Sequence, residues 1–219
     1  MNYLDAVAKT THAEYAQYSP YRVKLPERRS GPWRIKQFRT LVDGNYLAHV
    51  RKGRSPGVGI FTGLIHDKRD MVMSDVIPEI RDVLPYLPFL CGHVLITGLG
   101  LGMVPLMLRL RGSRAAATIT IIEKDPDVIR LVAPHLYLGP SSGRLRKIDV
   151  IEADAFTWKQ DRTFDCAWHD VWDRTAPINK QDYARLRRHY IIPPERQFCW
   201  GEARLLKPSA NLVTRHRKP

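Results

Sequence analysis

Cysteine is scarce in this sequence, and its few copies are far apart. The chain has three cysteines, Cys91, Cys166 and Cys199, and no CxxC pair. Three distant cysteines indicate neither a disulfide framework nor a zinc ribbon. The chain has 219 residues, of which 44% are hydrophobic, and is long enough to bury a core. We therefore expect a globular protein of a reducing compartment, the cytoplasm.

Signals for export or membrane insertion are also lacking. The N-terminus has no basic segment followed by an apolar run, the pattern of a signal peptide. Residues 83–108 contain no Asp, Glu, Lys or Arg, and this run exceeds the ~20 residues that a membrane helix needs. However, it contains three prolines and four glycines, which break a continuous helix. We expect a helix end, a strand, a turn and a second helix there, and no membrane partner.

Acidic residues are scarce at the two ends of the chain. Residues 1–54 carry 11 Lys/Arg against 4 Asp/Glu, and residues 174–219 carry 11 against 3, whereas residues 55–173 carry 13 against 15. Basic ends favour contact with a nucleic acid or another polyanion, because Lys and Arg release counterions from phosphates. A solvated surface explains the same charges equally well. The sequence also leaves a homodimer open.

Apolar runs alternate with helical patterns after residue 90. The runs with strand character are 93–98, 117–123, 148–154 and 164–170. Helices are predicted over 103–111, over 155–160, and after Asp125, which is a good N-cap before Pro126. This order predicts an α/β fold with a Rossmann-like, doubly wound, mostly parallel sheet. Only about 50 residues follow Asp170, so we expect a sheet that is truncated at the C-terminus.

The part of the chain before the first of these strands has a different pattern. Short strand-like runs at 33–41, 45–52 and 59–73 are separated by turn residues, which predicts a small antiparallel β unit. Ser74 is the predicted N-cap of a helix that leads into the sheet. The expected organisation is an arm (1–32), a small β unit (33–73), a Rossmann-like domain (74–200) and a basic tail (201–219).

The segment VLITGLGLGM places three glycines, Gly98, Gly100 and Gly102, directly after a predicted strand. A turn without side chains lets the backbone approach a ligand closely. The dinucleotide pattern GxGxxG needs a small residue at its sixth position, which is Met103 here. The pattern therefore favours a nucleoside ligand other than NAD.

Carboxylates end the next three predicted strands. Glu123 stands where an acidic side chain binds ribose hydroxyls, and Asp154, followed by the small Ala155, where it could meet an adenine. Asp170 ends the fourth strand. Because ligands of such sheets bind outside the carboxyl ends of the strands, these side chains should share a crevice with Gly98. The alternative is that they are helix caps and loop residues. His169 with Asp170 and Asp173 would be a poor metal site, and no metal is expected.

The motifs VLITGLGLG, TIIEKD, VIEADAF and FDCAWHDVWD together resemble the class I S-adenosylmethionine-dependent methyltransferases, and among them the spermidine synthase-like branch. The resemblance covers about residues 70–177. MVMSDVIPEIRD with GLGLG, and the later QFCWGEARLL, are similar to segments of methyltransferase-like proteins of tailed bacteriophages.

The resemblance implies S-adenosylmethionine as the cofactor. The glycine turn with Leu99 would contact the methionine part, Glu123 and Lys124 the ribose, and Asp154 with Ala155 the adenine. Asp170 and Asp173 would match the two aspartates of the D-S-S-D segment of aminopropyltransferases. Asp170 would orient or deprotonate the acceptor, and His169 would shape the acceptor pocket.

The expected function is methyl transfer to an unassigned acceptor, with a nucleic acid as the first choice from charge alone. One alternative is an aminopropyltransferase that uses decarboxylated S-adenosylmethionine, although the basic ends oppose a polycation. The other is a non-catalytic nucleotide-fold domain that binds nucleic acid through its basic ends, including residues 183–190, with stacking from Trp33 or Trp200.

Overall fold

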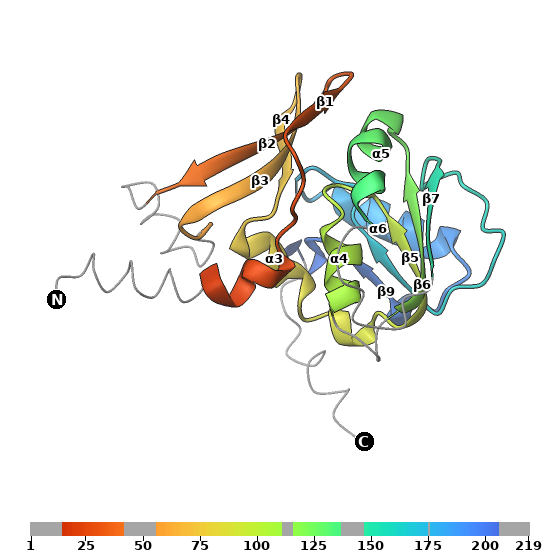
Figure 1. The fold of residues 1–219 in the computed structure, drawn as a ribbon. Coiled ribbons are helices and arrows are strands. Elements are labelled where there is room, and N and C mark those ends of the chain that lie inside the picture. The colour runs from red at the N-terminus through yellow and green to blue at the C-terminus, as the bar shows by residue number, and fades with distance from the viewer. Residues whose placement is uncertain (1–14, 42–55, 111–115, 137–146, 175, 206–219) are drawn as a thin grey trace.

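The computed structural model describes residues 15–41, 56–110, 116–136, 147–174 and 176–205. A four-stranded antiparallel sheet stands beside a five-stranded parallel sheet that is flanked by helices (Figure 1). None of the helices in these ranges is long and apolar enough to cross a membrane.

The antiparallel sheet is built by the N-terminal part of the chain. Its strands run in the order β1-β2-β3-β4 and are β1 (Arg28–Ser30), β2 (Trp33–Thr40), β3 (Gly59–His66) and β4 (Asp70–Ser74). The predicted strands at 33–41 and 59–73 are confirmed, the second as a hairpin, and the strand predicted at 45–52 lies outside the described residues. β1 lies within the predicted arm and was not predicted as a strand. Its three residues, which precede the Gly31-Pro32 turn, are too few to show an alternation of apolar and polar side chains.

Helix α3 (Ile77–Val83) follows this sheet and begins later than predicted. Ser74 is not its N-cap but the last residue of β4, where it pairs with Gly63. The N-cap is Val76, and no side chain caps the helix. The Ser74 hydroxyl instead donates a hydrogen bond to the Glu79 carboxylate at 2.9 Å, so the strand pairing outcompetes the local capping preference.

The parallel sheet has the order β7-β6-β5-β8-β9. Its strands are β5 (Gly92–Thr97), β6 (Ala116–Glu123), β7 (Lys147–Glu152), β8 (Cys166–His169) and β9 (Gln197–Cys199). The chain starts in the middle at β5, moves outward to β7, and returns to the other side of β5 with β8. This reversal confirms the doubly wound, Rossmann-like fold and places its topological switch point between β5 and β8. The four predicted strands are present, and β9 is an additional short one.

Helices connect these strands. They are α4 (Met103–Leu110), α5 (Pro126–Val132), α6 (Asn179–His189) and α7 (Glu202–Leu205), with 3-10 turns η1 (Ser19–Tyr21), η2 (Leu87–Phe89), η4 (Ala133–His135) and η5 (Pro194–Arg196). Asp125 caps α5 as predicted, accepting from the Asp127 amide. The helix predicted over 155–160 is wrong: the Asp154 carboxylate accepts from the Phe156 amide and holds the chain in a turn.

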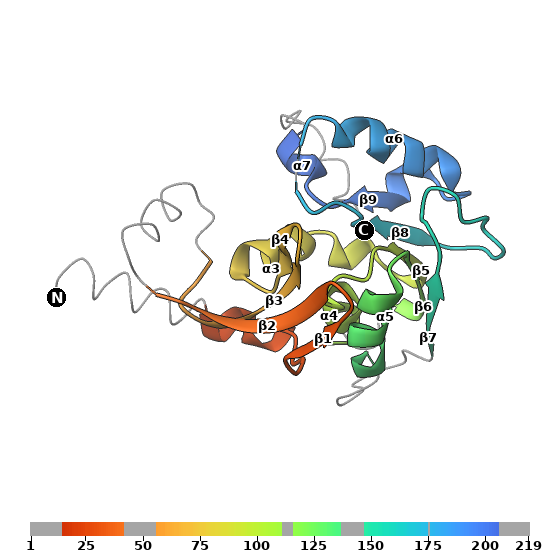
Figure 2. The ribbon, with the colours of Figure 1, turned by 90° about the horizontal axis from the view of Figure 1, so that it is seen from above.

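The parallel sheet is buried on both faces. Val94 and Ile96 of β5 belong to the core shared with α3, α4 and α5, whereas Leu95 between them packs in a second core with Leu186 of α6. Figure 2 shows α4 and α5 on one side of the sheet and α6 and α7 on the other. This explains why the strands read as continuous apolar runs, and it leaves only the strand ends to form a site.

Candidate nucleoside-binding site

A crevice opens at the carboxyl ends of the parallel strands, and residues of both sheets line it. Its larger part lies against the antiparallel sheet, and its smaller part reaches the end of β7. Gly98, Glu123, Lys124 and Val171 line both parts. The two parts therefore meet around Glu123 and can take one elongated ligand.

The glycine turn forms the floor of this crevice, but its three glycines have different surroundings. Gly98 has a φ of +90°, and a Cβ there would overlap the carbonyl oxygen of Asp170. Gly100, with a φ of +51°, lies under the sulfur of Met73, which accepts a hydrogen bond from the Leu101 amide. Gly102 faces Leu136 of the core instead of the crevice. The glycines thus serve tight packing, and only Gly98 and Gly100 line the crevice.

Glu123 joins the glycine turn to the end of β6. One carboxylate oxygen accepts from the Leu99 amide at 2.8 Å, and the other accepts from the Asp125 amide at 2.9 Å. The side chain of Leu99 is buried in the core, so Leu99 reaches the site through its backbone alone. Each carboxylate oxygen can accept a second hydrogen bond, and two such acceptors on one rigid group suit a vicinal diol.

The smaller part of the crevice is a slot between the ends of β6 and β7. Ala153, Asp154, Ala155 and Phe156 line it together with Lys124. The Asp154 carboxylate uses one oxygen for the Phe156 amide, and Asp154 remains exposed while Ala155 is buried. The structure therefore brings Asp154 and Ala155 to the same crevice as Glu123, as their strand-end positions predict.

Asp170 lies at the end of β8 in the larger part of the crevice. Burial raises the pKa of its carboxyl to about 7, and repulsion from Glu79 and Asp82 contributes to the rise. The Trp168 indole lowers the pKa of Asp170 and so opposes this rise, although the buried indole nitrogen has no hydrogen-bond partner among the described residues. Asp170 therefore exchanges a proton near neutral pH, which suits a general base.

The other two residues predicted beside Asp170 lie in contrasting environments. Asp173 is exposed and lines the crevice. His169 is fully buried, with Nδ1 2.9 Å from the Thr97 hydroxyl and Nε2 3.0 Å from Oε1 of Gln197. Burial lowers the pKa of His169 to about 4, so the ring is neutral at pH 7. The structure thus places His169 in the core, as a link between β5, β8 and β9, and not on the crevice.

The antiparallel sheet supplies lining residues that the strand-end pattern did not predict. Trp33 donates a hydrogen bond from its indole to Asp125 at 2.6 Å, and Arg69 lies over the Trp33 ring at 5.1 Å. Met73 of β4 and Glu79 of α3 line the crevice as well. Their presence depends on the contact between β1–β2 and the start of α5, which no local sequence pattern encodes.

The crevice is acidic although the whole chain is basic. The lining of its larger part contains five carboxylates and two basic groups: Glu79, Glu123, Asp125, Asp170 and Asp173 against Arg69 and Lys124. Within the described ranges, no group of three or more His, Cys, Asp or Glu is placed to hold a metal ion. A ligand that carries positive charge fits this lining best.

Replacing Asp170 by asparagine is expected to stabilise the protein in a pH-dependent way. Because its folded pKa of about 7 lies above the ~3.9 of an unfolded aspartate, the wild type loses stability as the pH rises from about 4 to 7. Asparagine does not titrate, so thermal unfolding should show a larger gain in Tm at pH 8 than at pH 4.5, corresponding to roughly 2–4 kcal/mol. An equal gain at both pH values would contradict the raised pKa.

Comparison with known proteins finds similarity only at a low level. No protein-family model matches the chain, and no curated protein sequence matches it. A solved structure titled "DhpI-SAM-HEP complex" is similar over 54% of this chain, with 17% sequence identity and a TM-score of 0.36. The aligned part spans about half of that protein, 53% of its length. A match at this level does not indicate the ligand of the present chain.

Proposed function

We propose that this chain binds S-adenosylmethionine and transfers its methyl group to an acceptor. The observation that carries this proposal is the crevice around Glu123, where a glycine turn, a carboxylate with two free acceptor positions and the slot of Asp154 and Ala155 follow one another along the carboxyl ends of β5, β6 and β7. This order matches an amino acid part, a ribose and a flat base in one extended molecule.

The residues of the crevice would have separate tasks. The backbone of Gly98 and Gly100 lies against the amino acid part, Glu123 holds the ribose hydroxyls, and Asp154 with Ala155 accommodates the adenine. When bound, S-adenosylmethionine supplies a methyl group on a positively charged sulfur. Asp170 orients the acceptor and takes its proton as the acceptor forms the new bond to the methyl carbon. The electron pair of the broken bond would stay on the sulfur of the bound cofactor, which would leave as a neutral thioether.

The acidic lining also favours a second candidate, aminopropyl transfer. Decarboxylated S-adenosylmethionine lacks the carboxylate and so carries one more positive charge, which Glu79, Asp170 and Asp173 would attract. Among the described residues, no Lys or Arg of the two basic ends, which oppose a polycation, lines the crevice. Tighter binding of the decarboxylated form than of S-adenosylmethionine itself, measured by calorimetry, would favour this candidate over methyl transfer.

The charge of the sulfur gives a test that needs no acceptor. S-adenosylmethionine and S-adenosylhomocysteine differ by one methyl group and one positive charge, and Asp170, with a pKa of about 7, is about one-tenth ionised at pH 6 and about nine-tenths at pH 8. Affinity for S-adenosylmethionine should therefore rise by up to about tenfold over this range, while affinity for the thioether stays nearly constant.

The matched variant for this test is Asp170→Asn. It should remove the pH dependence of S-adenosylmethionine binding without abolishing the binding of S-adenosylhomocysteine. If both compounds gain affinity by the same factor in the wild type, Asp170 does not sense the charge on the sulfur and its proposed place beside the reacting atoms is wrong.

A further inference from the structure

We propose that the outer face of the antiparallel sheet binds single-stranded nucleic acid and leads one base of it toward the crevice. The role of that base as methyl acceptor rests on the proposed function, whereas the binding does not. The first observation is that buried and exposed side chains alternate along β2. Trp33 and Ile35 are buried against the core, whereas Arg34 and Lys36 are exposed on the opposite face of the sheet.

The strand register places further side chains on this outer face. Arg34 stands opposite Arg29 of β1 and opposite Ile65 of β3, and Ile65 stands opposite Met71 of β4. Ile65 is partly exposed, and Met71 is 43% exposed. The outer face therefore combines cationic groups with accessible apolar groups, the two components that bind the backbone and the bases of a single strand.

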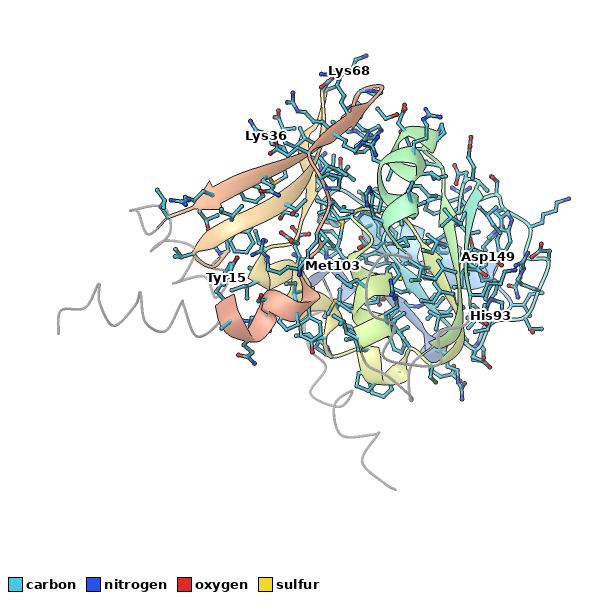
Figure 3. The ribbon with its side chains drawn as sticks, viewed as in Figure 1. Tyr15, Lys36, Lys68, His93, Met103 and Asp149 are labelled. Atoms are coloured by element: carbon cyan, nitrogen blue, oxygen red, sulfur yellow. The ribbon has the colours of Figure 1, made fainter. Side chains whose placement is uncertain are left out.

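The positive charge of this sheet is largely uncompensated. The described residues of the sheet and its turns, 28–41 and 56–74, contain seven Lys/Arg and two Asp/Glu. Arg29 is paired with Asp67, but neither Arg34 nor Lys36 forms an ion pair with another described residue. In Figure 3, Lys36 and Lys68 point away from the α/β unit. Arg34 and Lys36 are two residues apart on one strand, which separates them by roughly 6.8 Å and allows them to contact successive phosphates.

Helix α6, the other basic segment, is less suited to this task. The guanidinium of Arg187 is held by the Glu202 carboxylate and by the carbonyl of Gln197, and Arg185 lies over the Phe156 ring at 4.7 Å. Lys180 and Arg188 have exposed side chains and no partner within the described residues, but they lie eight residues apart on the helix. The track of phosphate contacts predicted over 183–190 is therefore interrupted on this helix.

The sheet is also connected to the crevice. The β3–β4 turn carries Lys68 on the outside and Arg69 on the rim, and Arg69 lies over Trp33. Trp172 and Trp200, which are both partly exposed, line the crevice beyond this rim, and aromatic rings of this kind stack on bases. A base has to leave a duplex before it can enter such a pocket, which favours a single strand as the occupant.

The test is fluorescence anisotropy with a labelled single-stranded oligonucleotide of mixed sequence, titrated over a series of salt concentrations. The variant Arg34→Gln with Lys36→Gln removes two exposed charges from the sheet, and Arg185→Gln with Arg188→Gln removes two from α6 as the matched control. We expect the sheet variant to bind about tenfold more weakly at low salt and to lower the salt slope by about 1.4. The affinity of the α6 variant for the oligonucleotide should stay within about twofold of the wild-type affinity.

Three results would overturn the proposal: no binding by the wild type at low salt, equal losses in both variants, or a duplex of the same sequence binding as tightly as the single strand. Calorimetry with S-adenosylhomocysteine on the same preparations separates this proposal from the proposed function. Nucleic acid binding with no nucleoside binding would leave the surface in place and reject the methyltransferase, and the reverse result would reject only the surface.

Discussion

Replacing Glu123 by alanine is expected to weaken the binding of S-adenosylmethionine and S-adenosylhomocysteine by about 100-fold or more. The variant removes both acceptors for the ribose hydroxyls, and a hydrogen bond to a charged group contributes about 1.5–3 kcal/mol. It also frees the Leu99 and Asp125 amides, which Glu123 now holds, so the glycine turn loses a fixed position. Isothermal titration calorimetry measures the effect directly.

Glu152 offers a matched control for this variant. It is the last residue of β7, pairs with Glu123 in the strand register, and is exposed. Glu152→Ala removes a carboxylate one strand away from Glu123. As a surface substitution, it should leave the affinity for both S-adenosyl compounds within about twofold of the wild-type value. Comparable losses in both variants would mean that general electrostatics, and not contact with the ribose, determines the binding.

Replacing Gly98 by alanine is expected to have the largest effect on stability. The residue has a φ of +90°, and a Cβ would overlap the Asp170 carbonyl oxygen, which belongs to the backbone and cannot rotate away. Left-handed backbone costs about 1–2 kcal/mol for an L-residue, and separating β5 from β8 adds more. We expect a loss of several kcal/mol and a fall in Tm of at least about 10 °C.

Gly63→Ala provides the comparison for Gly98→Ala. Gly63 is also in a buried strand, but the nearest atom to an added Cβ is the terminal methyl carbon of Met71, at 3.1 Å, on a flexible side chain. This variant should change Tm by no more than a few degrees. A Gly98→Ala protein with a Tm close to that of Gly63→Ala would contradict the close approach of β5 and β8 at the switch point.

The parallel sheet could be predicted because its determinants are local. β6 is a run of β-branched residues, and Asp125 with Pro126 starts α5 at the predicted position. The prediction is incomplete where tertiary contacts determine the secondary structure. β9 has three residues and forms by pairing with β8. Ser74 pairs with β3 and does not cap a helix. Short elements that depend on partners distant in sequence show no hydrophobic periodicity from which they could be predicted.

The site shows the same division. Glu123, Asp154 and Asp170 could be brought together from sequence because each lies at, or one or two residues after, the carboxyl end of a parallel strand. His169 immediately precedes Asp170, yet alternation along β8 turns its ring into the core. Arg69 and Met73 come from a different sheet and carry no recognisable motif. The net charge was misleading as well, because a chain with a formal charge of +13 encloses an acidic crevice.

Binding of S-adenosylmethionine, S-adenosylhomocysteine and NAD to the unmodified protein, measured side by side by calorimetry, tests the central claim most directly. The crevice around Glu123 predicts that the first two bind with one site per chain and that NAD binds at least about 100-fold more weakly, a difference of about 2.7 kcal/mol. If neither S-adenosyl compound binds, or if NAD binds as well as they do, the assignment of the crevice to an S-adenosyl nucleoside is wrong.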